Sequence, residues 1–149
     1  MGDVRDLRSA ASERRRRADL FGDELVLHAE TAAPRQARHW VMRTIAAAGV
    51  GGSSNQIVEL LTGELVSNAV VHGPHEGTVH VSVGIGNGTV RVEVGDDGAG
   101  EPRVRHPEPT ALSGRGLALV DALSASWGTQ PRGAHGQGKV VWFEVPIDE

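Results

Sequence analysis

The sequence predicts a two-layer α/β sandwich, in which about three helices cover a mixed, mostly antiparallel sheet of four or five strands. Apolar residues recur at helical spacing in the first half of the chain, and they alternate with polar residues over 78–85 and 89–94. The sequence Gly86-Asn87-Gly88 between these two stretches predicts a β-hairpin. The 149 residues suffice for one domain with a core of its own.

The N-terminal residues differ in composition from the rest. Residues 1–22 are polar and include four consecutive arginines at positions 14–17. Such a segment buries little apolar surface, so we expect a flexible tail and leave open whether its arginines dock a partner. The domain is expected over residues 23–149. It should begin with a strand at residues 24–29.

Two helices are expected next. Pro34 suits the first position of a helix because its fixed φ fits there, and Gly49 would end that helix. Ser53 or Ser54 could cap the second helix, which would end by Gly73. Its apolar stripe is expected to consist of Ile57, Leu60, Leu61, Leu65 and Ala69.

Loops and shorter elements are expected in the C-terminal third. Residues 101–113 are rich in proline and charge and suit a mobile lid. An apolar helical stretch follows over residues 117–123, and a short strand is expected near residues 126–128. A glycine-rich loop over residues 133–138 leads into the last strand, which ends near residue 146.

The second helix carries the first of three polar or glycine-rich clusters. Glu64 and Asn68 are four residues apart and therefore share one face of the helix. The amide oxygen of Asn68 suits Mg²⁺, and Glu64 could orient or deprotonate a water or hydroxyl nearby. An isolated pair of this kind is usually a solvated stripe, so its interpretation depends on the other two clusters.

The second cluster, Asp96 with Gly98 and Gly100, follows the second strand of the hairpin. A carboxylate at a strand end can accept a hydrogen bond from an exocyclic amine such as that of adenine, and glycines allow close backbone approach to a flat ring. In the third cluster, Gly114 and Gly116 precede a helix whose N-terminal amides could hold phosphate oxygens. Each cluster alone could equally be a plain turn or helix start.

Together, the three clusters resemble the asparagine box and the two glycine boxes of the GHKL ATPases, the superfamily of gyrase, histidine kinases and heat-shock chaperones. The resemblance covers about residues 24–147 and is greatest to the bacterial anti-sigma-factor serine/threonine kinases. It implies the histidine-kinase-like ATPase fold, with ATP or ADP and Mg²⁺ held between the layers. It also implies that Asn68 coordinates Mg²⁺, that Glu64 is the general base, and that Asp96 binds the adenine amine.

The same resemblance gives the remaining motif residues a place at the pocket and its lid. Arg115 could meet a terminal phosphate there or face solvent. The other residues implied to contact the nucleotide are Gly98, Gly100, Gly114, Gly116 and Leu117.

By this resemblance, we expect an ATP-binding anti-sigma regulatory factor. It would act as a serine/threonine protein kinase on an anti-sigma-factor antagonist and would sequester a sigma factor. The alternative is a regulatory ATP-binding module that sequesters a partner without significant kinase activity. The catalytic half of a split histidine kinase is disfavoured, because no phosphoacceptor helix with a candidate histidine precedes residue 24. Whether the chain forms a homodimer is left open.

Composition and motifs exclude several other classes. The absence of cysteine excludes disulfides, thiolate zinc sites and a cysteine nucleophile. The net charge of −4 gives no general attraction for nucleic acid or anionic membrane. Since no signal region or long apolar stretch is found, the cytoplasm is the expected compartment. His72 and His75 lack a third ligand for a metal, and Ser113 lacks a nucleophile elbow.

Overall fold

The computed structural model describes residues 22–73, 76–97, 112–131 and 138–148. In chain order, these residues form β1 (Gly22–His28), α2 (Ala33–Ala47), α3 (Gly52–His72), β2 (Thr78–Gly86), β3 (Thr89–Asp96), α4 (Leu112–Leu123), β4 (Ser126–Pro131) and β5 (Lys139–Pro146). Three expected segments fall wholly or largely outside the described residues: the tail at 1–22, the lid at 101–113 and the loop at 133–138.

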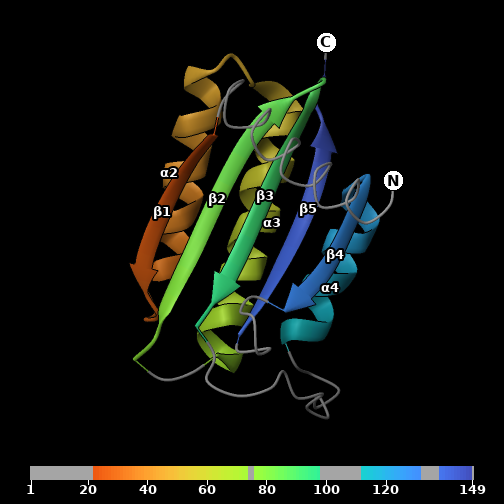
Figure 1. Cartoon of the computed structure of the whole chain (residues 1–149). Helices are drawn as coiled ribbons and strands as arrows, with labels where there is room; N and C mark the ends of the chain where they lie inside the picture. The colour runs from red at the N-terminus through yellow and green to blue at the C-terminus, as the bar shows by residue number, and fades with distance from the viewer. Residues whose placement is uncertain (1–21, 74–75, 98–111, 132–137, 149) are drawn as a thin grey trace, which may run out of the picture.

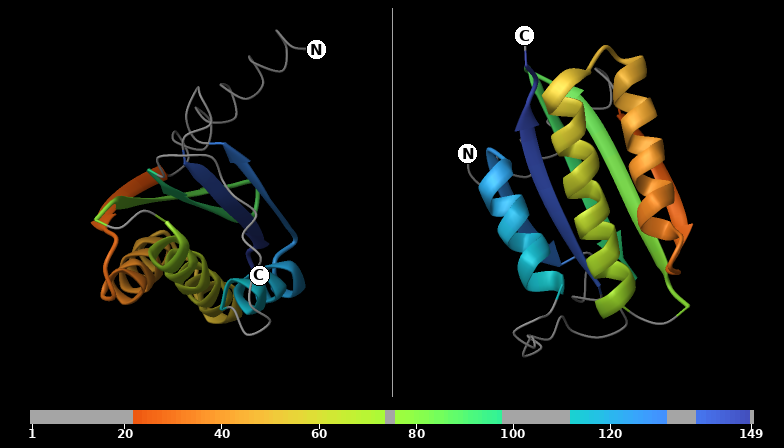
Figure 2. Two further views of the ribbon diagram at one scale, coloured as in Figure 1. Left: turned by 90° about the horizontal axis from the view of Figure 1, so that it is seen from below. Right: turned by 180° about the vertical axis from the view of Figure 1, so that it is seen from behind.

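The strands form one five-stranded sheet in the order β1-β2-β3-β5-β4. The helices α2, α3 and α4 cover one face of this sheet, and α3 lies between the other two (Figures 1 and 2). The predicted two-layer α/β class is therefore confirmed. The expected mixed character of the sheet is corrected, because each of its neighbouring strand pairs in the described residues is antiparallel.

The core lies between the sheet and the helices. Residues of the central strands point alternately towards the helices and away from them, as the period of a strand requires. The register places Val81 beside Val94 and Val92 beside Phe143, and all four side chains are buried. Even-numbered positions of β2 and odd-numbered positions of β3 consequently face the opposite side of the sheet.

The predicted hairpin joins β2 to β3 through two residues. Asn87 has φ of 55° and Gly88 has φ of 74°. Two successive positive φ values are typical of the type I′ turn, whose twist matches that of the strands it connects. This turn fixes the register in which Val79 pairs with Asp96 at the far end of the hairpin.

The start of α3 differs from the prediction. The residue before the helix is Gly51, and no side chain caps the helix. Ser54 instead lies inside the first turn, where it is 1% exposed. Its Oγ donates to the carbonyl oxygen of Pro146 at 3.1 Å and accepts from the backbone N–H of Asp148 at 2.7 Å. The hydroxyl predicted as a local cap therefore ties α3 to the chain beyond β5.

The buried face of α3 is also wider than predicted, and it does not coincide with the predicted apolar stripe. Leu60 is 41% exposed, whereas Leu61, Leu65 and Ala69 are buried as expected. Val66 and other positions that the predicted stripe omitted are buried too. Because α3 packs against the sheet, α2 and α4 together, most of its circumference is buried. The spacing of apolar residues in the sequence therefore cannot show which side of the helix stays exposed.

The helix α4 begins earlier than predicted, at Leu112 instead of residue 117. Gly114 and Gly116 consequently lie inside its first two turns and do not precede it. Glycine is a poor helix former, which is why the sequence suggested a later start.

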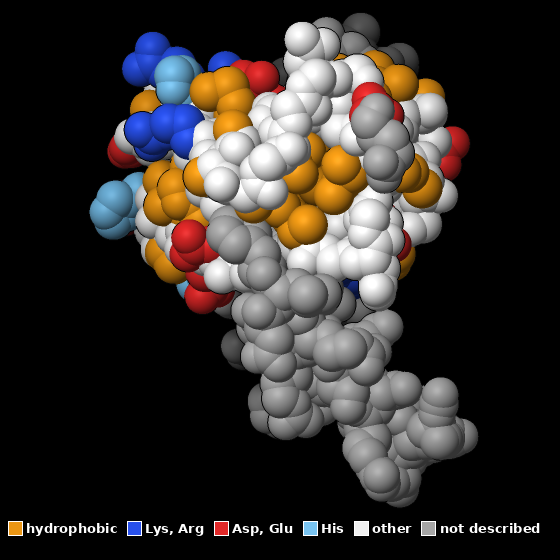
Figure 3. Space-filling model, turned by 90° about the horizontal axis from the view of Figure 1, so that it is seen from above, with side chains coloured by type: hydrophobic (Ala, Val, Ile, Leu, Met, Phe, Trp, Pro, Cys, Tyr) orange, Lys and Arg blue, Asp and Glu red, His pale blue; other side chains and the backbone are white. Residues whose placement is uncertain are grey.

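In the described ranges, no helix is both long and apolar enough to cross a bilayer. At the end of the molecule that carries the connection between α2 and α3, hydrophobic side chains reach the surface between polar ones, with Lys and Arg at one side (Figure 3).

Candidate functional site

The first and third motif clusters meet where α3 packs against α4. Glu64 and Asn68 are half-buried on α3, and Gly116 of α4 lies directly against them. A Cβ atom built on Gly116 would lie 3.1 Å from Oε1 of Glu64 and 3.3 Å from Nδ2 of Asn68. Glycine is thus the residue that leaves room at this contact for both polar side chains.

The second cluster approaches the same helix from the sheet. Asp96 is the last residue of β3, pairs with the inward-facing Val79, and is only 6% exposed. A Cβ atom built on Gly73, the residue that follows α3, would lie 3.7 Å from Cβ of Asp96. The carboxylate of Asp96 is therefore buried at the C-terminal end of α3.

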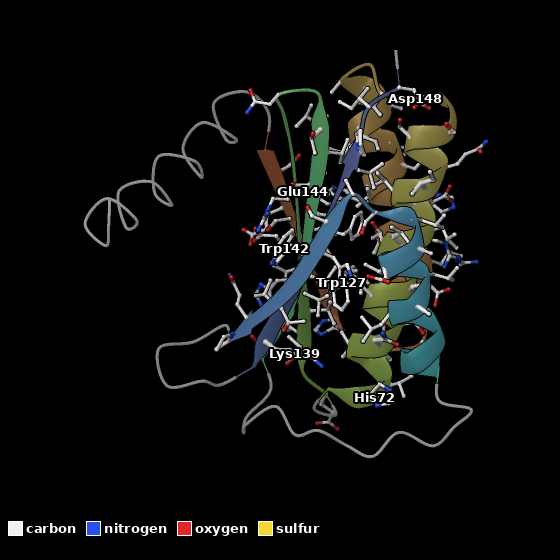
Figure 4. All side chains as sticks on the ribbon, turned by 90° about the vertical axis from the view of Figure 1, so that its right-hand side faces the viewer. His72, Trp127, Lys139, Trp142, Glu144 and Asp148 are labelled. Atoms are coloured by element: carbon white, nitrogen blue, oxygen red, sulfur yellow. The ribbon has the colours of Figure 1, made fainter. Side chains whose placement is uncertain are left out.

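These contacts place the described members of the three clusters around one end of the central helix. Asn68 precedes Gly73 by five residues, which corresponds to about 7.5 Å along a helix axis. The end of β3 and the start of α4 lie at this same end of the molecule, which the side chain of His72 marks (Figures 1 and 4). Motif residues that are far apart in the sequence thus lie close together in the folded chain.

Gly73 is a site residue that the sequence analysis treated only as a helix end. Its backbone N–H donates to the carbonyl oxygen of Ala69 at 2.9 Å, and an added Cβ would lie 2.4 Å from that oxygen. A side chain at position 73 would therefore displace the chain where it passes Asp96. The one signal for this role in the sequence is its position directly after the motif helix.

Several predicted site residues lie outside this description. Gly98 and Gly100 are not among the described residues, nor are the side chains of the first turn of α4, which include Arg115. Gly114 belongs to that first turn, and Leu117 is half-buried and packs against the core. Because α4 begins at Leu112, the unbonded amides at its N-terminus precede Gly116. That these amides hold phosphate oxygens stays a prediction.

The chemistry of the described residues fits a magnesium nucleotide. No group of three or more His, Asp or Glu side chains suited to a metal occurs in the part of the chain that the structure describes. A cation held by Asn68 would therefore depend on phosphate oxygens and water for its other ligands, as Mg²⁺ does in many phosphate-binding sites. The buried carboxylate of Asp96 is an acceptor suited to an amine of the base.

A five-stranded antiparallel sheet covered by three helices, with these clusters at one end of the central helix, defines an ATPase domain of the GHKL type. The chain belongs to the histidine kinase-like ATPase domain family, whose profile matches residues 27–144. No match was found among curated proteins.

Solved structures with the same fold come from several bacteria. The structure of the RsbU and RsbW domains of Rv1364c from Mycobacterium tuberculosis has 22% identity and a TM-score of 0.63, over 85% of this chain and 32% of that one. The blue-light activated histidine kinase EL346 of Erythrobacter litoralis has 29% identity and a TM-score of 0.52, over 66% and 32%. This chain thus spans about a third of the length of each of these two.

Proposed function

We propose that this chain binds ATP or ADP with Mg²⁺ and is a serine/threonine protein kinase that phosphorylates an anti-sigma-factor antagonist and sequesters a sigma factor. Membership of the ATPase domain family implies the nucleotide. The observation that carries the proposal is the contact of Gly116 with both Glu64 and Asn68, because it brings the residues proposed as general base and metal ligand together with α4 at one point.

Each described polar residue has a role in this proposal. Asp96 accepts a hydrogen bond from the exocyclic amine of adenine, so the buried carboxylate selects adenine over a base that presents a carbonyl at that position. Asn68 holds Mg²⁺, which when bound neutralises charge on the phosphates. Gly116 keeps the space beside these ligands free of a side chain.

Glu64 is proposed as the general base. In phosphotransfer to a serine, the hydroxyl oxygen forms a bond to the γ-phosphorus, the bond from that phosphorus to the β–γ bridging oxygen breaks, and ADP leaves. The hydroxyl proton passes to the carboxylate of Glu64, one turn before Asn68 on α3. A half-buried carboxylate at this place can reach a group next to the metal ligand without rearrangement of the helix.

The identity of the partners rests on the resemblance of the three clusters to anti-sigma-factor kinases. The likeness to the RsbU and RsbW domains of Mycobacterium tuberculosis, at 22% identity, supports the same fold. We place the activity in the cytoplasm, where sigma factors act. The second candidate, a module that sequesters its partner without phosphorylating it, uses the same nucleotide site and differs only in the role of Glu64.

A pair of measurements on Glu64→Gln separates the two candidates. The variant keeps the size and polarity of the side chain but cannot accept a proton at neutral pH. We expect calorimetric titration to give the wild-type affinity for Mg·ADP. Phosphorylation of a partner recovered by pull-down should fall by about 10²- to 10⁴-fold, the usual contribution of a general base. Mass spectrometry of the partner identifies the phosphorylated residue.

The control is Glu59→Gln, the same substitution on the same helix, five residues before the proposed base. It should leave both binding and phosphotransfer unchanged. Equal phosphotransfer rates in wild type and Glu64→Gln would remove the catalytic role from Glu64. If wild type binds ADP but phosphorylates no recovered partner, the sequestering module is the correct function.

A further inference from the structure

The residue after the proposed adenine ligand points to the opposite face of the sheet. Asp96 faces the helices, whereas Asp97 contacts Thr78 and His80, which alternate along β2 with the buried residues Val79 and Val81 and so face away from the helices. Neither the sequence motifs nor the nucleotide site described above assigns a role to Thr78, His80 or Asp97.

These three side chains form a network of two hydrogen bonds and one longer contact between His80 and Asp97. The hydroxyl of Thr78 donates to Oδ2 of Asp97. That hydroxyl has a single proton, so its oxygen can only accept from Nε2 of His80, 3.3 Å away. The same Nε2 lies 3.4 Å from Oδ1 of Asp97. Each oxygen of the carboxylate thus has a contact within the network.

The network acts where the backbone pairing of the sheet runs out. On the β5 side, the ladder of β3 ends with the pair Gly95 and Val140. On the β2 side it ends with the pair Asp96 and Val79. Asp96 is thus the last residue of β3 in its ladder with β2, and Asp97 follows beyond that last pair. The contacts of Asp97 with Thr78 and His80 restrain the chain at this point.

We propose that Thr78, His80 and Asp97 are positioning residues, which fix the end of β3 from the outer face of the sheet so that Asp96 presents its carboxylate to adenine on the inner face. The inference rests on the proposed nucleotide site and deepens it. Adjacent residues of a strand point to opposite faces, so a rotation that moved Asp97 outward would swing Asp96 with it. The network resists that rotation.

Thr78→Val tests the proposal with a nearly isosteric change. One lost hydrogen bond should lower the affinity for ADP by about 2- to 10-fold in calorimetric titration of the full chain. Inosine diphosphate lacks the exocyclic amine, so its affinity should not change. Thr78→Ser, which restores the hydroxyl, should restore ADP binding. Without nucleotide, amide hydrogen exchange at Asp96 and Asp97 should be faster in Thr78→Val than in wild type.

Thr89→Val is the matched control, because Thr89 begins β3 at the other end of the strand and lies on the same outer face. It should bind ADP as wild type does. Asp97→Ala is the second variant and should reproduce the selective loss of ADP affinity. Wild-type ADP affinity in both Thr78→Val and Asp97→Ala, with wild-type exchange rates, overturns this inference alone. Failure of the wild-type protein to bind ADP overturns the proposed nucleotide site and this inference with it.

Discussion

Gly116→Ala should separate the stability of α4 from its function. In the interior of a helix, glycine is about 0.8–1 kcal/mol less favourable than alanine, so the substitution by itself should favour α4. The added Cβ would lie 3.1 Å from Oε1 of Glu64 and 3.3 Å from Nδ2 of Asn68. Both distances are shorter than the separation of about 3.5–4.0 Å at which such atoms attract. The two side chains must therefore move by a few tenths of an ångström.

The free protein can accommodate that movement, because Glu64 and Asn68 are only half-buried and their ends can turn. The protein with bound Mg·ADP cannot, since Asn68 must then hold its position at the metal ion. Overpacking typically costs about 1–3 kcal/mol, which corresponds to a loss of affinity of roughly 5- to 150-fold if the bound state alone bears it. The free energy of unfolding without nucleotide should change by less than about 1 kcal/mol, because the better helix propensity of alanine and the cost of its close contact offset each other.

Calorimetric titration with Mg·ADP and urea unfolding of the free protein measure the two quantities. Gly63→Ala is the control: it is the same substitution in the neighbouring helix, and its Cβ would meet the side chain of Arg38, with Cδ at 2.7 Å, on the α2 side. It should retain the affinity for Mg·ADP. If Gly116→Ala binds Mg·ADP as tightly as wild type, the contact has no part in nucleotide binding.

Three further substitutions test other parts of the structure. Asn68→Ala should weaken binding of Mg·ADP but not of ADP in the presence of EDTA, and an equal loss in both titrations would contradict the metal assignment. Asp96→Ala should lower both the affinity for ADP and the preference for ADP over GDP. Asp96→Asn should lower both quantities less, because the amide oxygen can still accept a hydrogen bond. If Asp96→Ala kept the wild-type preference for ADP, Asp96 would not be the adenine ligand. Ser54→Ala should lower the free energy of unfolding by about 1–3 kcal/mol in urea, since it leaves the carbonyl of Pro146 and the N–H of Asp148 without their partner. Wild-type stability in Ser54→Ala would show that the Ser54 contacts contribute nothing.

The parts of the fold that could be predicted are those that local chemistry determines. The alternation of valines on either side of Asn87 and Gly88 admits few structures other than a hairpin, and the turn has the two positive φ values that this pair of residues favours. The spacing of Glu64 and Asn68 likewise requires one helix face. These predictions needed no knowledge of what lies next to each element.

The errors arose where tertiary contacts decide the outcome. Ser54 is a plausible cap by its local sequence, but the chain beyond β5 supplies it with partners that are 92 and 94 residues away. The exposure of Leu60 depends on how α2 and α4 flank α3. In these two corrections, contacts distant in sequence override a local preference. The helix α4 also includes Gly114 and Gly116, despite the low helix propensity of glycine.

In the candidate site, too, the sequence predicts some features and tertiary contacts decide others. The motif residues could be found because their types are chemically distinctive, but a motif does not reveal what holds it in place. Gly73 limits the approach of the chain to Asp96, and Thr78 and His80 hold the neighbouring carboxylate from the far side of the sheet. Thr78 lies on a strand that carries no motif, so its contribution follows from register alone. A search for residues that tune nucleotide affinity in this family should therefore include the strand paired with the end of the aspartate-bearing strand, as well as the glycine boxes themselves.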